Sequence, residues 1–68
     1  MNKRQGKILA MVYANAGEGA SLDRICKQLG ISRTVASMEI GQLVELNAVK
    51  EYPGELFKPS SGKLKMMS

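Results

Sequence analysis

Apolar residues near the start of the chain recur with the periodicity of an α-helix. The residues that gather on one side of this helix are Ile8, Leu9, Met11, Val12 and Ala16. Asn2 is suited to cap the first turn, and Gln5 can bond back to it as in a capping box. Gly17 is a natural residue to end the helix. The pattern therefore predicts a first helix over residues 3–16.

A second helix is predicted between two residues that favour helix ends. Ser21 can cap its first turn, Asp23 places a negative charge where the helix dipole favours one, and Gly30 ends it. Its apolar face consists of Leu22, Ile25 and Leu29. Just before it, Ala20 is placed to pair briefly as a strand.

The third helix is predicted over about residues 33–46. Ser32 can cap its start, and Asn47 can adopt the left-handed conformation at its end. Its inward face is made of three apolar residues, Ala36, Ile40 and Leu43. Three further apolar residues fall on the outward or flanking faces: Val35, Met38 and Val44. Outward apolar side chains indicate contact either with bases or with a protein.

Two runs typical of β-strands, Val49–Tyr52 and Leu56–Lys58, flank Pro53 and Gly54. Pro followed by Gly is the signature of a type II turn. Because that turn is not the favoured connection of a tight hairpin, we expect a looser loop. Pro59 should stop the second strand. The order of elements therefore predicts an α+β chain that is mainly helical.

Length and composition narrow the class of protein. The 68 residues form one domain, over residues 1–59, followed by a basic tail over residues 60–68. One cysteine and no histidine exclude an internal disulfide and argue against a metal site. The residues also offer no nucleophile–base pair, so we expect neither an enzyme nor a cofactor. The longest apolar run, Ile8–Ala14, is too short to cross a membrane, and we expect a cytoplasmic protein in which Cys26 is a buried, reduced thiol.

The charge balance favours a polyanionic partner. Ten Lys and Arg residues against six Asp and Glu residues give a net charge of +4. The resulting pI of about 9.5 is typical of nucleic-acid-binding domains. Many small proteins are also mildly basic, so the charge alone raises this expectation only modestly.

The segment Leu29-Gly30-Ile31-Ser32 joins the second and third helices as a short turn. Gly30 can take the left-handed backbone that a sharp turn needs, and Ile31 can fill the corner between the helices. Ser32 caps the third helix and leaves its positive end open, which suits a phosphate. Two helices joined in this way form a helix-turn-helix.

Residues 22–59 resemble the winged helix-turn-helix superfamily of bacterial and archaeal transcription regulators, such as the small fimbrial-operon regulators or the MarR and ArsR types. In that pattern a helix ends in Leu-Gly-Ile-Ser, and Leu-x-x-x-Gly-x-Val leads into the wing. Here the second motif reads Leu43-Val44-Glu45-Leu46-Asn47-Ala48-Val49, with asparagine in the glycine position. The resemblance implies a winged helix that binds double-stranded DNA sequence-specifically in transcriptional regulation. The recognition helix, about residues 33–46, would enter the major groove, with the 49–58 hairpin as wing.

The candidate DNA contacts fall into two groups. Those on the outward face of the third helix are Ser32, Arg33, Thr34, Ser37, Met38, Gly41 and Gln42. The candidate phosphate contacts are Arg24, Lys27, Lys50 and Lys58, with Lys3, Arg4 and Lys7 at the N-terminus. Arg24, Lys27 and the N-terminal cations could equally form a solvated surface. Arg33 could bond guanine or a phosphate, and Met38 could pack against a thymine methyl group.

Two further interpretations remain open. The outer face of the third helix, with Met38, could instead dock on a protein partner. RNA is a weaker third option, because the few aromatic residues, Tyr13, Tyr52 and Phe57, are not clustered. Small DNA-binding domains commonly act as dimers, and a homodimer of this chain would have to use the first helix, the tail or the hairpin.

Overall fold

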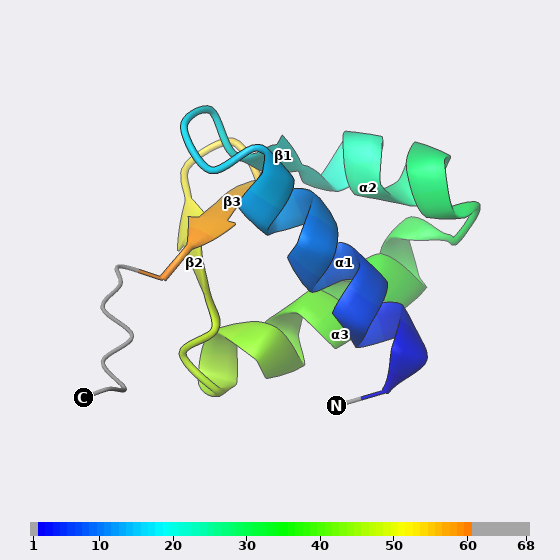
Figure 1. Ribbon diagram of the computed structural model, residues 1–68. Helices are drawn as coiled ribbons and strands as arrows, with labels where there is room; N and C mark the ends of the chain where they lie inside the picture. Colours follow the sequence, from blue (N-terminus) through cyan, green and yellow to red (C-terminus); the bar gives the residue numbers. More distant parts are fainter. Residues whose placement is uncertain (1, 61–68) are drawn as a thin grey trace.

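The order of helices and strands follows the sequence pattern closely. The computed structural model describes residues 2–60. Its elements are α1 (Lys3–Ala14), β1 (Ala20–Ser21), α2 (Leu22–Leu29), α3 (Arg33–Glu45), β2 (Val49–Tyr52) and β3 (Leu56–Pro59). This arrangement confirms an α+β fold that is mainly helical (Figure 1). Almost all of the predicted tail, from residue 61 onward, lies outside the described residues.

The helix starts agree with the predicted caps. Asn2 and Gln5 form the capping box of α1. Ser21 accepts a hydrogen bond from the backbone N–H of Arg24, and Ser32 accepts one from the N–H of Val35. Each serine thereby satisfies an amide that has no partner within its own helix.

The predicted end of α1 was wrong. The helix ends at Ala14, before Gly17, and Asn15 forms its C-cap. The Asn15 side-chain amide donates a hydrogen bond to the Met11 carbonyl at 2.9 Å, and its backbone N–H bonds to the carbonyls of Met11 and Val12. Asparagine competes with the helix for carbonyl acceptors in this way, which ends the helix early.

The three strands form one antiparallel sheet in the order β1-β3-β2. The last strand is thus the central one. Tyr52 pairs with Leu56, so Pro53, Gly54 and Glu55 form the hairpin loop. With three residues the loop is looser than a two-residue turn, as expected, and Gly54 and Glu55 within it have positive φ, 86° and 57°. β3 ends at Pro59, one residue later than the predicted Lys58, and Pro59 pairs with Val49.

Gly19 brings the start of the sheet close to β3. Its φ is +86°, a conformation that favours glycine. A Cβ atom built on Gly19 would lie 2.9 Å from the Phe57 carbonyl oxygen and 2.9 Å from the Lys58 Cγ atom. Only a residue without a side chain allows this approach.

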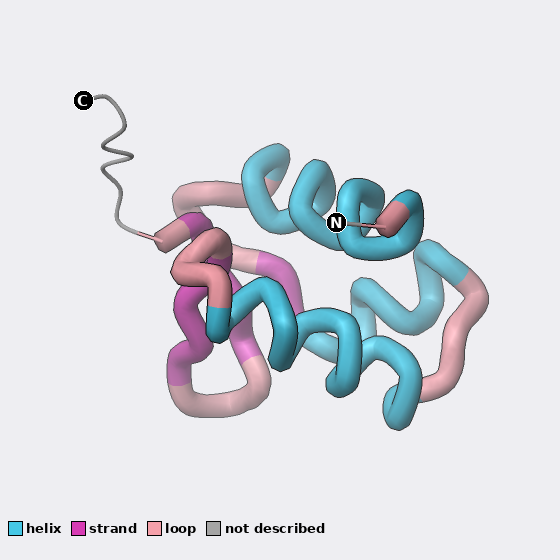
Figure 2. The backbone as a smooth tube through the Cα atoms, turned by 90° about the horizontal axis from the view of Figure 1, so that it is seen from below, coloured by secondary structure: helices cyan, strands magenta, loops and turns pink. Residues whose placement is uncertain are grey.

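The core lies between the three helices and the sheet, which closes one end of the molecule (Figures 1 and 2). The buried apolar residues are Ile8, Val12, Ala20, Leu22, Ile25, Ala36, Ile40, Leu43, Val49 and Phe57. The predicted inward face of the third helix is therefore confirmed. Cys26 is half-buried against this core, less enclosed than expected. No helix in the described part of the chain is long and apolar enough to cross a membrane.

Candidate nucleic-acid interface

The turn between α2 and α3 is built by backbone hydrogen bonds and one left-handed residue. Gly30 has a φ of 66°, and its N–H donates to the Cys26 carbonyl at 2.8 Å. The Ile31 N–H donates to the same carbonyl at 3.2 Å, while its side chain is half-buried against the core. The N-terminal end of α3 starts at the exposed Ser32, so its first turn is open to solvent.

The outward face of α3 carries small side chains. Its exposed predicted contacts are Thr34, Ser37, Met38, Gly41 and Gln42. We call Thr34, Ser37, Met38 and Gly41 the reading face. Met38 is 55% exposed and is the only large apolar side chain on this face. Val35 and Val44 are half-buried, and Val44 packs against the core, so they add little apolar surface.

Arg33 is engaged by two carboxylates. Its guanidinium lies 2.6 Å from Asp23 of α2 and 2.6 Å from Glu55 of the hairpin loop. The hydrogen bond to Glu55, followed by its charge, raises the pKa of Arg33. All three side chains are more than half exposed, so these ion pairs are worth little individually. Their geometry nevertheless links α2, α3 and the hairpin loop through one residue.

Glu39 and Gln42 take part in polar contacts between α3 and α1. Glu39 is only 3% exposed, and its carboxylate accepts hydrogen bonds from Arg4 at 2.9 Å and from Asn2 at 3.2 Å. The Gln5 side chain donates a hydrogen bond to the side-chain carbonyl of Gln42. Gln42 is therefore held toward α1, at the edge of the reading face. Glu39 was not predicted as a contact residue.

The hydrogen bonds that the Glu39 carboxylate accepts lead to a pH-dependent stability. Hydrogen bonds from Arg4 and then Asn2 lower the pKa of Glu39 below its usual 4.5. A carboxylate with a lowered pKa stabilises the fold above its unfolded-state pKa, and this contribution is lost as the pH falls through the folded-state value. We expect Glu39→Gln to be less stable than the wild type at neutral pH and to lose less stability on acidification. Urea unfolding at neutral and acidic pH measures this difference, and parallel pH profiles would contradict it.

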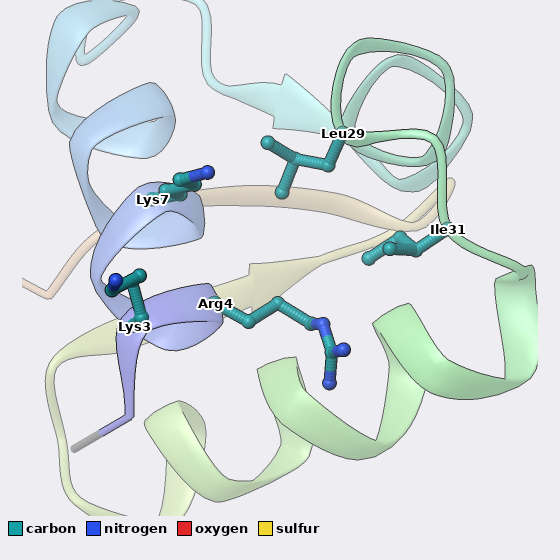
Figure 3. Close-up of a pocket in the computed structure, with 5 residues that line it drawn as sticks. All are labelled: Lys3, Arg4, Lys7, Leu29 and Ile31. Carbon is teal, nitrogen blue, oxygen red and sulfur yellow. The ribbon is translucent and has the colours of Figure 1, made fainter.

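Three cations of α1 surround a hollow beside the helix-turn-helix turn. Lys3, Arg4 and Lys7 line it together with Leu29 and Ile31, and its volume is about 290 Å³ (Figure 3). Arg4 also pairs with Glu39, whereas no ion pair of Lys3 or Lys7 is present in the described part of the chain. The predicted N-terminal cations thus line the α1 side of this hollow, across from Leu29 and Ile31. Arg24 and Lys27 are exposed on α2.

The hairpin places its two lysines side by side. Lys50 and Lys58 are directly paired across β2 and β3. Their ammonium groups lie 6.0 Å and 5.0 Å from the centroid of the Tyr52 ring. Like charges opposite each other on a sheet are unfavourable, and a cation–π contact offsets part of that cost. The result is a positively charged surface on the hairpin.

The described residues contain no cluster of His, Cys, Asp and Glu side chains that could hold a metal ion. Comparison of the chain with protein-family models, with curated proteins and with solved structures finds no match.

Proposed function

We propose that the chain is a winged helix-turn-helix protein that binds double-stranded DNA sequence-specifically in transcriptional regulation. In this proposal α3 enters the major groove, and the β2–β3 hairpin is the wing. The observation that carries it is the exposed reading face of α3, next to an open helix N-terminus that Ser32 caps. The element order α1-β1-α2-α3-β2-β3 supports the winged-helix assignment.

The reading face suits close approach to base edges. Its side chains are short or unbranched, and Gly41 adds no side chain at all. Thr34 and Ser37 can donate or accept hydrogen bonds, and Met38 can contact a thymine methyl group. Gln42 would bond a base only after leaving Gln5, so we place it outside the initial contact set.

Exposed cations flank the reading face on three elements. They are Lys3 and Lys7 of α1, Arg24 and Lys27 of α2, and Lys50 of the hairpin, beside the half-buried Lys58. The helices α1 and α2 and the strand β2 each pack against α3. Contacts to phosphates position a protein on DNA, whereas contacts to bases select the sequence. In this proposal the cations therefore supply the affinity for DNA, and the reading face supplies the discrimination between base sequences.

An NMR titration with a random duplex at low and high salt tests the proposal. We expect the backbone signals of Arg33, Thr34, Ser37 and the hairpin to shift together at low salt and to return at high salt. With roughly four to five phosphates neutralised, log K should fall with log salt at a slope of about −4. If no signal shifts at low salt, the chain does not bind DNA.

The ion pairs of Arg33 with Asp23 and Glu55 allow a separate test of whether Arg33 contacts DNA. If Arg33 contacts DNA after leaving its ion pairs, Arg33→Ala should weaken binding to a selected target by roughly tenfold or more. Glu55→Gln should then strengthen binding, because it frees the guanidinium and removes a negative charge near the phosphates. Affinities from fluorescence anisotropy compare the two variants. Unchanged affinity in Arg33→Ala would leave Arg33 only the role of joining α2, α3 and the hairpin.

A protein-interaction function gains less support from the surface of α3. Met38 stands among Thr34, Ser37 and Gly41, so the apolar area around it is small. The other exposed large apolar residue of this region, Leu46, lies at the C-cap of α3. If DNA binding fails, a pull-down that compares the wild type with Met38→Lys tests this second function. Equal capture of a partner by both proteins would contradict it.

A further inference from the structure

The outer side of α1 carries an apolar groove. Gly6, Leu9, Ala10 and Tyr13 line it, and its volume is about 360 Å³. Tyr13 is 46% exposed, Ala10 is exposed, and Gly6 and Leu9 are half-buried. All four residues come from one helix, so no other element of the described chain covers the groove.

Gly6 has no evident role in a single copy of the chain. A Cβ atom built on it meets nothing within 4 Å, and its φ is not in the left-handed region. Glycine within a helix costs about 1 kcal/mol relative to alanine. An isolated chain would therefore be more stable with alanine at this position. The missing side chain does, however, allow another surface to approach the helix closely.

We infer that the groove of α1 binds α1 of a second copy of this chain, with the two helices antiparallel. A twofold axis between Leu9 and Ala10 places Gly6 of one copy opposite Tyr13 of the other. Tyr13 has the largest side chain of the groove, and Gly6 has none. The same axis places Leu9 opposite Ala10. Large residues thus face small ones throughout the pairing.

The charges of α1 favour this occupant and this direction. Lys3, Arg4 and Lys7 all lie near its N-terminus, and its last turn has no basic residue. Cations near a helix N-terminus are unfavourable, whereas cations near a C-terminus are favourable. An antiparallel partner brings Lys3 of each copy to the carbonyl end of the other helix, beyond which lies Glu18. A parallel pair would instead bring the cations of both copies together.

The pairing leaves the reading face of α3 exposed, while Lys3 of each copy lies beside the other helix. In Figure 2, α1, which begins at the N label, runs along one edge of the molecule, and α3 crosses the near side. The reading face belongs to α3 and the groove belongs to α1 alone. A dimer through α1 therefore does not depend on DNA, and its test is separate from that of the proposed function.

Sedimentation equilibrium of the full chain without DNA tests the dimer. We expect the apparent mass to rise with concentration from 7.4 kDa toward twice that value. Ala10→Glu should raise the dissociation constant by about tenfold or more, equivalent to at least about 1.4 kcal/mol. The matched control is Leu46→Glu, because Leu46 is 64% exposed and lies at the end of α3. A chain that stays monomeric, or equal weakening by both variants, would overturn the inference.

Gly6→Ala gives a second test of the dimer, and it does not introduce a charge into the interface as Ala10→Glu does. The variant should unfold at a higher urea concentration, because alanine is the better helix former and the space above Gly6 is open. It should also dimerise more weakly, because the added methyl group lies where Tyr13 of the second copy would pack. A Gly6→Ala variant that dimerises as well as the wild type would contradict the close approach.

Disulfide cross-linking distinguishes the two helix directions. In a Cys26→Ala background, Ala10→Cys lies beside the twofold axis and should form a covalent dimer on oxidation. Gly6→Cys alone should not, since the two cysteines would be far apart, whereas Gly6→Cys combined with Tyr13→Cys should. A disulfide requires Cβ atoms about 3.5–4.5 Å apart. Efficient cross-linking of Gly6→Cys alone would overturn the antiparallel arrangement.

Discussion

Gly19→Ala is expected to destabilise the fold by about 2–4 kcal/mol. The φ of +86° at Gly19 is strained for any residue with a Cβ atom. The new atom would also lie 2.9 Å from the carbonyl oxygen of Phe57 in the central strand. The Lys58 side chain can move aside, but the Phe57 carbonyl belongs to the sheet and cannot. A domain of this size has a total stability of only about 3–5 kcal/mol, so the variant should lose most of its free energy of unfolding.

Urea unfolding followed by circular dichroism measures this effect. Gly6→Ala is the matched control, because it makes the same chemical change where there is open space and no positive φ. Its intrinsic effect is a stabilisation of up to about 1 kcal/mol, so the two variants should shift in opposite directions. The comparison is made at a concentration where the chain is monomeric, because Gly6 also lies in the proposed dimer interface. A Gly19→Ala variant as stable as the wild type would show that the approach to β3 is not close.

Gly41→Glu is expected to weaken DNA binding by at least about 100-fold while the chain stays folded. A side chain at Gly41 meets nothing within 4 Å, so the fold accommodates it. The same side chain would stand at the C-terminal end of the reading face, between α3 and the base edges. Its carboxylate would also be repelled by the phosphates. Steric exclusion and charge repulsion thus act in the same direction.

Gly17→Glu controls for the change in net charge. Gly17 is exposed, lies after α1 rather than on α3, and a side chain there also meets nothing within 4 Å. This variant should lose affinity only modestly, through long-range repulsion that salt screens. Fluorescence anisotropy at one salt concentration compares the two variants. Equal losses of affinity in the two variants would mean that position 41 does not lie at the contact with DNA.

Local signals explain why most of the fold could be predicted from the sequence. Serine before an apolar run, glycine after one and alternating strand residues each act over a few neighbours. The prediction of the end of α1 failed because two residues, Asn15 and Gly17, are both suited to end the helix. Gly17 has the stronger preference for helix ends, but Asn15 comes first in the chain and binds the Met11 carbonyl. Such competition depends on side-chain rotamers, which the pattern does not specify.

The candidate site was less predictable, because its partners are distant in the sequence. The exposure of Thr34, Ser37, Met38 and Gly41 followed from helical periodicity alone. The ion pairs of Arg33 involve α2 and the hairpin loop, and no local rule brings these segments together. Glu39 did carry a signal, since it lies three residues after Ala36 and four before Leu43 on the inward side of α3. An acidic residue at an inward position of a helix indicates a basic partner on another helix.

The central position of β3 also sets an order on folding during synthesis. The segments that form α1, β1, α2, α3 and β2 leave the ribosome before β3, so β1 and β2 emerge without the strand that lies between them. Both strands pair only with β3, so the sheet cannot form until residues 56–59 have emerged. Until then the apolar residues that Phe57 covers remain exposed to solvent and to other chains. The complete sheet, and with it the closed core, therefore forms only after the C-terminal strand has emerged.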